Sequence, residues 1–213
     1  VSDEQAAALM LKGMTVRYLF KDTYAVKPGD TILFHAAAGG VGQIACQWAK
    51  ALGVSLIGTA GSDEKCEIAR QKGAAHTINY SRENVVERVR EITQGRGVPV
   101  VYDGVGKDTF EMSLDCLAPR GLLATFGNAS GPVTGVNLGI LTQKGSLYVT
   151  RPSLMHYVAS DADLAANTAD VFDAVARGAI SIDINQRYAL ADAQKAHEDL
   201  EARRTTGASV LVP

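Results

Sequence analysis

The chain has 213 residues, 46% of them hydrophobic and 21% charged, and its 21 basic and 23 acidic side chains leave a formal net charge of −2. This composition excludes collagen-like and disordered chains, and the near-neutral charge argues against a broad nucleic-acid-binding face. The longest apolar runs fall well short of the roughly 20 residues that a membrane-spanning helix needs. A chain of this length is typical of one principal globular domain.

The three cysteines, Cys46, Cys66 and Cys116, are odd in number and lie far apart in the sequence. This spacing predicts neither a disulfide framework nor a zinc cluster. Because a chain without disulfides suits a reducing compartment, we expect a cytoplasmic protein.

Short apolar runs alternate with amphipathic stretches from residue 31 onwards, which is typical of strand–helix units that build a parallel sheet. A helix over residues 5–19 precedes them. Strands are predicted at residues 31–35, 55–60, 76–80, 98–103, 121–126 and 146–150. Helices are predicted at 41–52, 63–72, 82–92 and 108–117, and a long loop at 127–145 holds a short helix at 138–142. The fold class is therefore α/β, a Rossmann-type doubly wound, six-stranded parallel sheet flanked by helices.

Serine and glycine mark the predicted ends of these helices. Ser62 and Ser81 are predicted N-caps, and Gly73 ends the helix that Ser62 begins. Two further helices are predicted at residues 161–177 and 190–203. The last apolar run, residues 208–212, resembles a strand that stands alone and needs an edge to pair with.

A glycine-rich turn lies between the first predicted strand and the helix that follows it. Read from Ala37 to Gly42 it is A-x-G-x-x-G, the dinucleotide-binding fingerprint with alanine at the first position. Small side chains let the backbone approach a pyrophosphate, which binds the free N–H groups at the positive end of the helix. A tight turn without a ligand is the alternative, but the order of strand, turn, helix and second strand favours a nucleotide site.

The cofactor choice depends on the end of the second strand, about 20 residues past the fingerprint, where NAD enzymes place an acid on the ribose. That position is Gly61, which has no side chain to repel a 2′-phosphate. Lys65 can supply a positive charge and Ser62 a hydroxyl, so the sequence predicts NADP(H). In the alternative interpretation Lys65 is a surface lysine that pairs with nearby acids.

Four motifs stand in order along the chain: FHAAAGGVG at 34–42, YDGVG at 102–106, FGN at 126–128 and TRPSL at 150–154. Together they resemble the zinc-independent, zeta-crystallin-like NADPH:quinone oxidoreductases of the medium-chain dehydrogenase/reductase superfamily. The resemblance implies hydride transfer from NADPH to a quinone or conjugated carbonyl, and a homodimer formed through the edge strand 146–150.

Proteins of that family also carry a GroES-like catalytic domain that this sequence lacks, so we expect the chain to be a fragment. The resemblance divides it into a linker helix at 1–24, an NADP(H)-binding Rossmann domain at 25–178, and a C-terminal segment at 179–213 that returns toward the catalytic domain. The strand at 208–212 would then pair outside the nucleotide domain.

The resemblance further implies which residues contact the cofactor. The pyrophosphate would lie on the fingerprint residues Gly39, Gly40 and Val41, and the 2′-phosphate among Gly61, Ser62, Lys65 and Tyr80, with Gly104 beside the ribose. The nicotinamide half would be lined by Phe126, Gly127, Asn128, Pro152, Ser153 and Leu154, with Tyr18 and Arg203 on its flanks. In the alternative interpretation Tyr18, Tyr80 and Phe126 are half-buried aromatics, and Arg203 is a helix-end cation.

No residue forms a convincing general acid, base or nucleophile, so the catalytic groups are unknown from the sequence, and Asp103 is expected to shape a turn. No Cys or His occurs at residues 1–34, where zinc-dependent relatives place a cysteine near Lys12. The four histidines are scattered, so we predict no metal site. Three alternatives stay open: an enoyl or alkenal reductase of the same superfamily, a nucleotide-sensing or RNA-binding module, and a structural dimerisation unit.

Overall fold

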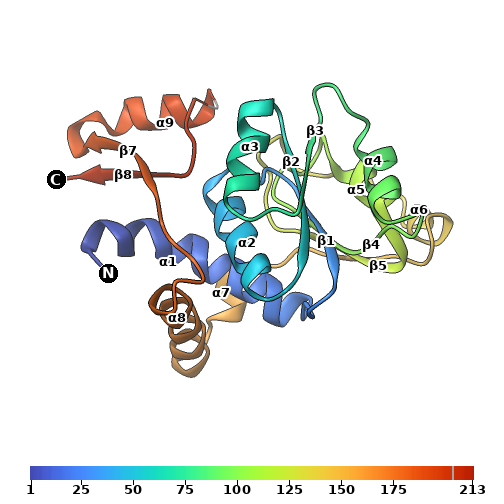
Figure 1. The fold of residues 1–213 in the computed structure, drawn as a ribbon, viewed down its shortest axis with the longest axis horizontal. Helices are drawn as coiled ribbons and strands as arrows, with labels where there is room; N and C mark the ends of the chain where they lie inside the picture. Colours follow the sequence, from blue (N-terminus) through green and yellow to red (C-terminus); the bar gives the residue numbers. More distant parts are fainter. Residues whose placement is uncertain (203) are drawn as a thin grey trace.

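The computed structural model describes residues 1–202 and 204–213 of the chain (Figure 1). Its centre is a parallel sheet of six strands in the order β3-β2-β1-β4-β5-β6. These strands are β1 (Thr31–Phe34), β2 (Ser55–Ala60), β3 (His76–Asn79), β4 (Val98–Asp103), β5 (Leu117–Thr125) and β6 (Tyr148–Thr150). The order confirms the doubly wound prediction, because the chain returns to the middle of the sheet after β3. A switch point, where such sheets bind ligands, therefore lies between β1 and β4.

Helices cover both faces of this sheet. The helices are α1 (Asp3–Tyr18), α2 (Gly40–Ala51), α3 (Asp63–Gln71), α4 (Val85–Ile92), α5 (Phe110–Cys116), α6 (Gly139–Gln143), α7 (Leu154–Tyr157), α8 (Asp161–Ala176) and α9 (Ala193–Glu201). Strand residues alternate between two cores: Ile32 and Phe34 pack with α1, α2 and α8, whereas Leu33 packs with α4 and α5. A sheet that is apolar on both faces explains why its strands read as near-continuous hydrophobic runs.

The predicted helix caps have different outcomes. The predicted N-cap Ser62 is confirmed, since its hydroxyl accepts from the backbone N–H of Lys65 at 3.2 Å at the start of α3. The prediction of Ser81 as an N-cap is wrong. Asn84 caps α4 instead, and Oδ1 of Asn84 accepts from the N–H of Val86 at 3.0 Å. Both residue types can cap a helix, and the tertiary structure uses the Ser81 hydroxyl elsewhere, to donate to the carbonyl of Gly61 at 2.8 Å.

The helix predicted at residues 5–19 is present as α1, which continues into a π-helical turn over Leu19–Thr23. Its buried residues, among them Leu9 and Val16, join the core that α2 and α8 share. No helix among the described residues has both the length and the apolar character needed to cross a bilayer.

The strand β8 (Ala208–Val212) does not stand alone, which corrects the prediction from the sequence. It pairs in parallel with β7 (Ile184–Ala189), a strand that the sequence patterns do not predict. This small sheet lies between α1 and α9, away from the central sheet (Figure 1). The sequence of β7, INQRYA, is too polar to stand out as a strand, because every second side chain is exposed. The helix predicted at 190–203 is divided into a 3-10 turn, Leu190–Asp192, and α9, and Arg203 lies outside the described residues.

Candidate functional site

The glycine turn between β1 and α2 lies at the carboxyl edge of the sheet, beside the switch point. Gly39 has the extended conformation of an N-cap, and α2 starts at Gly40, so the first-turn N–H groups have no partner within the helix. A Cβ on Gly42 would lie 2.5 Å from the carbonyl oxygen of Ala36 and 2.6 Å from Cα of Ala37. Glycine is therefore required for the helix to start this close to the strand.

A pocket of about 360 Å³ opens beside this turn. It is lined by Ala36, Ala38, Gly39, Gly40, Ala60, Gly61, Lys65, Tyr80, Val105, Ala129, Leu200, Thr205, Thr206 and Gly207. Five of the sequence-predicted residues are among these, namely Gly39, Gly40, Gly61, Lys65 and Tyr80. The pocket therefore joins the fingerprint to the residues predicted to choose the cofactor.

At the β2 end of the pocket, Gly61 and Tyr80 are in close contact. A Cβ on Gly61 would lie 2.6 Å from the Tyr80 hydroxyl oxygen, so a side chain at position 61 would displace this ring. Tyr80 is 48% exposed, which leaves one side of it available to a ligand. Asp63, one of the acids that the alternative interpretation pairs with Lys65, forms an ion pair with Arg82 at 2.7 Å and accepts from the side-chain amide of Asn79 at 2.9 Å.

A buried polar network fixes the turn after β4, on the other side of the switch point. Asp103 is fully buried and accepts from the N–H groups of Val105 at 2.7 Å and Gly106 at 3.1 Å. It also accepts from the hydroxyls of Thr109 at 2.7 Å and Ser113 at 3.0 Å. These contacts confirm that Asp103 shapes the turn, since all four donors belong to the residues that follow it.

His35 extends this network from the end of β1. Its Nε2 lies 3.0 Å from the Ser113 hydroxyl, and its Nδ1 lies 2.9 Å from that of Thr59. Because Ser113 donates its proton to Asp103, it accepts from Nε2–H, and the neutral ring then accepts at Nδ1. Burial lowers the pKa of His35, and the charge of Asp103 opposes this shift. The network therefore joins the ends of β1, β2 and β4.

The turn after β5 carries Phe126, Gly127 and Asn128, and it packs directly on the turn after β4. The N–H of Phe126 donates to the carbonyl of Asp103 at 2.8 Å, and a Cβ on Gly104 would lie 3.1 Å from Cζ of Phe126. The Phe126 ring also contacts Phe34, with a centroid separation of 5.8 Å. Gly104 and the FGN motif, distant in sequence, are thus brought together at the edge of the sheet.

The remaining predicted residues lie around β6 and α1. Pro152 is buried, Ser153 is exposed, and Leu154 begins α7. Tyr18 is 2% exposed and stacks on Tyr157 at a centroid distance of 4.5 Å, and burial raises its pKa to about 12. None of these residues lines the pocket beside the glycine turn.

The sequence patterns do not predict that the C-terminal segment forms part of the pocket wall. Gly207 forms a parallel backbone bridge with Gly39, and Thr205 and Thr206 line the pocket. The sequence patterns also do not predict that Lys12 of α1 lies beside the glycine turn. A Cβ on Gly40 would lie 2.6 Å from Cε of Lys12. Burial lowers the pKa of Lys12. Neither site carries a local signal, because each depends on segments far apart in the sequence.

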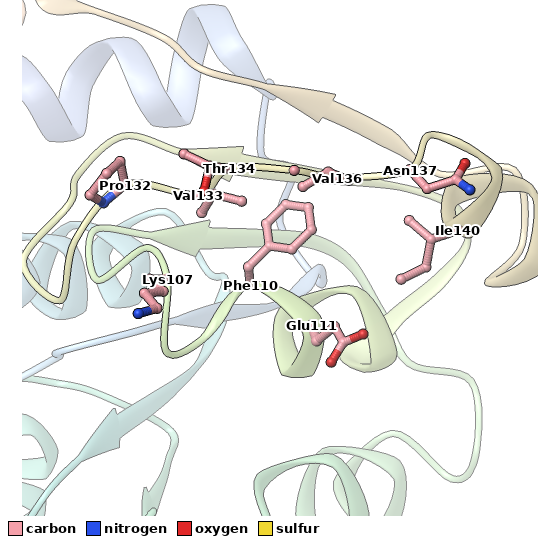
Figure 2. Close-up of a pocket in the computed structure, with 10 residues that line it drawn as sticks. Lys107, Phe110, Glu111, Pro132, Val133, Thr134, Val136, Asn137 and Ile140 are labelled. Atoms are coloured by element: carbon pink, nitrogen blue, oxygen red, sulfur yellow. The ribbon is translucent and has the colours of Figure 1, made fainter.

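A larger pocket of about 440 Å³ lies between α5 and the loop that carries Val133 and Val136. Figure 2 shows the Phe110 ring directed from α5 toward this loop, with Lys107 and Glu111 on either side. Its lining includes Gly135 and the first turn of α5, but it has no A-x-G-x-x-G turn, and α5 is only seven residues long. It therefore lacks the combination of fingerprint and long helix that binds a dinucleotide.

Comparison with known proteins agrees with this geometry. Residues 40–173 match the family of zinc-binding dehydrogenases, and they make up well over half of the chain. The chain belongs to the zinc-binding dehydrogenase family. It is 65% identical to a quinone oxidoreductase of Pseudomonas aeruginosa over 99% of the chain and 65% of that protein.

Solved structures of family members superpose closely on this dehydrogenase-family chain. A quinone oxidoreductase from Pseudomonas syringae has a TM-score of 0.98 at 60% identity, and the Escherichia coli quinone oxidoreductase complexed with NADPH has a TM-score of 0.98 at 58% identity. Each match covers 100% of this chain and 66% of the other. The chain thus spans just under two thirds of the length of these relatives.

The name of the family raises the question of zinc, and the described residues do not fit that metal. Among them, no group of three or more Cys, His, Asp or Glu side chains is placed to hold an ion. Burial raises the pKa of Cys46 and Cys116 to about 12, which disfavours the thiolates that bind zinc. Both ring nitrogens of His35 are already occupied by hydroxyl groups.

Proposed function

We propose that this chain binds NADP(H) at the switch point and is the cofactor-binding part of an NADPH-dependent quinone reductase. The observation that carries the proposal is the pocket beside the glycine turn, where Gly61, Lys65 and Tyr80 stand in place of an acid. The close similarity of the chain to quinone oxidoreductases, including one complexed with NADPH, supports both the proposed cofactor and the proposed acceptor.

In this proposal the pyrophosphate binds at the start of α2, on the backbone of Gly39, Gly40 and Val41. The 2′-phosphate lies among Gly61, Ser62, Lys65 and Tyr80, and the ribose lies beside Gly104. The nicotinamide half extends toward Phe126, Gly127, Asn128, Pro152, Ser153 and Leu154, with Tyr18 on its flank. The strand order supports this direction, because β2, β1, β4, β5 and β6 follow one another across the sheet.

The bound cofactor would supply the hydride that reduces a quinone or conjugated carbonyl. The residues of this chain bind and orient it: the start of α2 and Lys65 balance its negative charges, and the paired turns after β4 and β5 form a fixed support. The buried bonds of Asp103 hold these turns, so the site is formed before the ligand arrives. We assign no catalytic residue and no zinc to this chain.

A parallel titration with NADPH and NADH, followed by nicotinamide fluorescence, tests the cofactor assignment. We expect NADPH to bind at least about tenfold more tightly, because a charge-assisted contact to the 2′-phosphate is worth roughly 1.5–3 kcal/mol. Equal affinity for the two nucleotides would contradict the assignment to NADP(H). Binding of neither would contradict the nucleotide site itself.

We also propose that the protein forms a homodimer through the edge strand β6. Tyr148 is 62% exposed and Val149 is 37% exposed, so this edge presents apolar side chains beside unpaired backbone groups. Val149→Lys is expected to give monomers in sedimentation velocity, because it places two charges in a symmetric contact. Leu211→Lys is the matched control, because Leu211 is an exposed apolar residue on the separate strand β8. Tyr188→Lys is unsuitable as a control, because it would remove the hydrogen bond from the Tyr188 hydroxyl to Asp199.

Leu147 is not a suitable probe of this edge, although it precedes the strand in sequence. It is 6% exposed and belongs to the core on the α4 and α5 face, so a lysine there would disturb folding. A Val149→Lys variant that sediments like the wild-type dimer would contradict the proposed interface.

We further propose a cytoplasmic location and the division of the chain into residues 1–24, 25–178 and 179–213. The cytoplasmic location is supported by three free cysteines, which suit a reducing compartment. For the division, the support is the separate β7–β8 sheet at the end of the chain.

A further inference from the structure

Arg151 follows β6 and joins three segments at the nicotinamide end of the proposed site. Its Nη1 donates to the carbonyl of Thr125, the last residue of β5, at 2.6 Å. Its Nη2 donates to Oδ1 of Asn128 at 3.2 Å, in the amide orientation that also lets Asn128 donate to the carbonyl of Gly127 at 2.9 Å. The guanidinium therefore links β6 to the end of β5 and to the FGN turn.

The positive charge of Arg151 has no carboxylate partner within the described part of the chain. Both of its bonds go to neutral oxygens, which use two of its five N–H donors. Arg151 and Asn128 also line a pocket of about 340 Å³ together with Val149 and Leu138. A rigid, planar cation thus stands beside open space at this end of the sheet.

Other bonds already hold part of the FGN turn. Backbone bonds join Phe126 to Asp103 at 2.8 Å and Ser130 to Val105 at 2.8 Å, so the side of the turn that faces β4 is fixed without Arg151. The side that faces β6 depends on Arg151, because the backbone bonds named above do not involve the Asn128 side chain. Removing it would free the Asn128 amide to rotate and would leave the turn in place.

We propose that Arg151 is a positioning residue that fixes the nicotinamide end of the cofactor site and has no part in the adenosine end. This rests on the proposed NADP(H) site. The separation of the two ends supports it: β2 and β6 are four strand spacings apart in the sheet, roughly 19 Å at about 4.8 Å per spacing. A local change at Arg151 can therefore act on one half of the ligand.

The two halves can be separated with two ligands, NADPH and adenosine 2′,5′-bisphosphate, which lacks the nicotinamide. In calorimetric titrations, Arg151→Met is expected to weaken NADPH binding about tenfold and to change binding of the bisphosphate less than twofold. Arg151→Lys is expected to lose about as much, because an ammonium cannot donate to both oxygens in one plane. Arg177→Met, at an exposed helix end, is the matched control and should change neither affinity.

The outcomes are distinguishable. Unchanged NADPH binding in both variants, or an equal loss for the two ligands, would overturn the role of Arg151 and leave the proposed function intact. If the methionine variant does not fold, Arg151→Lys decides the same comparison. A wild-type chain that binds neither ligand would overturn the proposed function and this inference together.

Discussion

Replacing Lys65 with glutamate is expected to weaken NADPH binding roughly 100-fold or more and to change NADH binding less than about threefold. Lys65 lines the pocket beside Gly61 and Tyr80, where the 2′-phosphate is proposed to lie. The substitution removes a charge-assisted bond of about 1.5–3 kcal/mol and adds repulsion between two anions. Because each 1.4 kcal/mol is about tenfold in affinity, the sum exceeds about two orders of magnitude. Nicotinamide fluorescence titration measures both nucleotides.

Lys27→Glu is the matched control for this substitution. It makes the same change in net charge at an exposed residue before β1, at the opposite, amino edge of the sheet. If long-range charge governed binding, both variants would lose affinity alike. NADPH binding that survives Lys65→Glu would identify Lys65 as a surface lysine and contradict its place in the 2′-phosphate site.

The second large effect is expected from Asp103→Ala, which should lower the free energy of unfolding by roughly 3–5 kcal/mol. The fully buried carboxylate accepts from two N–H groups and two hydroxyls, all between Val105 and Ser113. Alanine would leave the buried N–H groups of Val105 and Gly106 without this acceptor, and the Thr109 hydroxyl would keep only the carbonyl of Gly106, at 3.2 Å. The Ser113 hydroxyl would no longer be oriented to accept from Nε2–H of His35. Urea unfolding followed by circular dichroism measures the change.

Asp108→Ala provides the comparison, because that side chain is exposed and lies on the same turn. It should change the free energy of unfolding by less than about 0.5 kcal/mol, as surface substitutions usually do. If Asp103→Ala were as mild, water would have to replace the carboxylate, and the turn after β4 would not depend on this network.

Local patterns in the sequence were sufficient for the central sheet. All six strands and the helices between them lie within a few residues of where apolar periodicity predicts them, because a sheet buried on both faces leaves continuous hydrophobic runs. The bounds differ at β5, which begins at Leu117, before the predicted start at residue 121. The glycine turn was equally readable, since the close approach of Gly42 to the backbone of Ala36 and Ala37 admits no side chain. The predicted cofactor residues Gly61, Lys65 and Tyr80 line one pocket because they follow the ends of adjacent parallel strands, β2 and β3.

Contacts between distant segments were decided by the tertiary structure. Ser81 and Asn84 are both capable caps, and the carbonyl of Gly61 determines which of them is used. The pairing of β7 with β8 and the bridge of Gly207 to Gly39 close one wall of the pocket. Arg151, Asp103 and His35 likewise have their roles only through partners on other strands.

The physical reason for this division is the range of each interaction. Hydrophobic periodicity and the steric demands of a tight turn act over a few residues, so the sequence by itself determined the α/β sheet and the position of the fingerprint. Hydrogen bonds between side chains have partners tens of residues away, and folding alone brings those partners within about 3 Å. The closed wall of the pocket and the buried support beneath it were therefore decided only when the chain had folded.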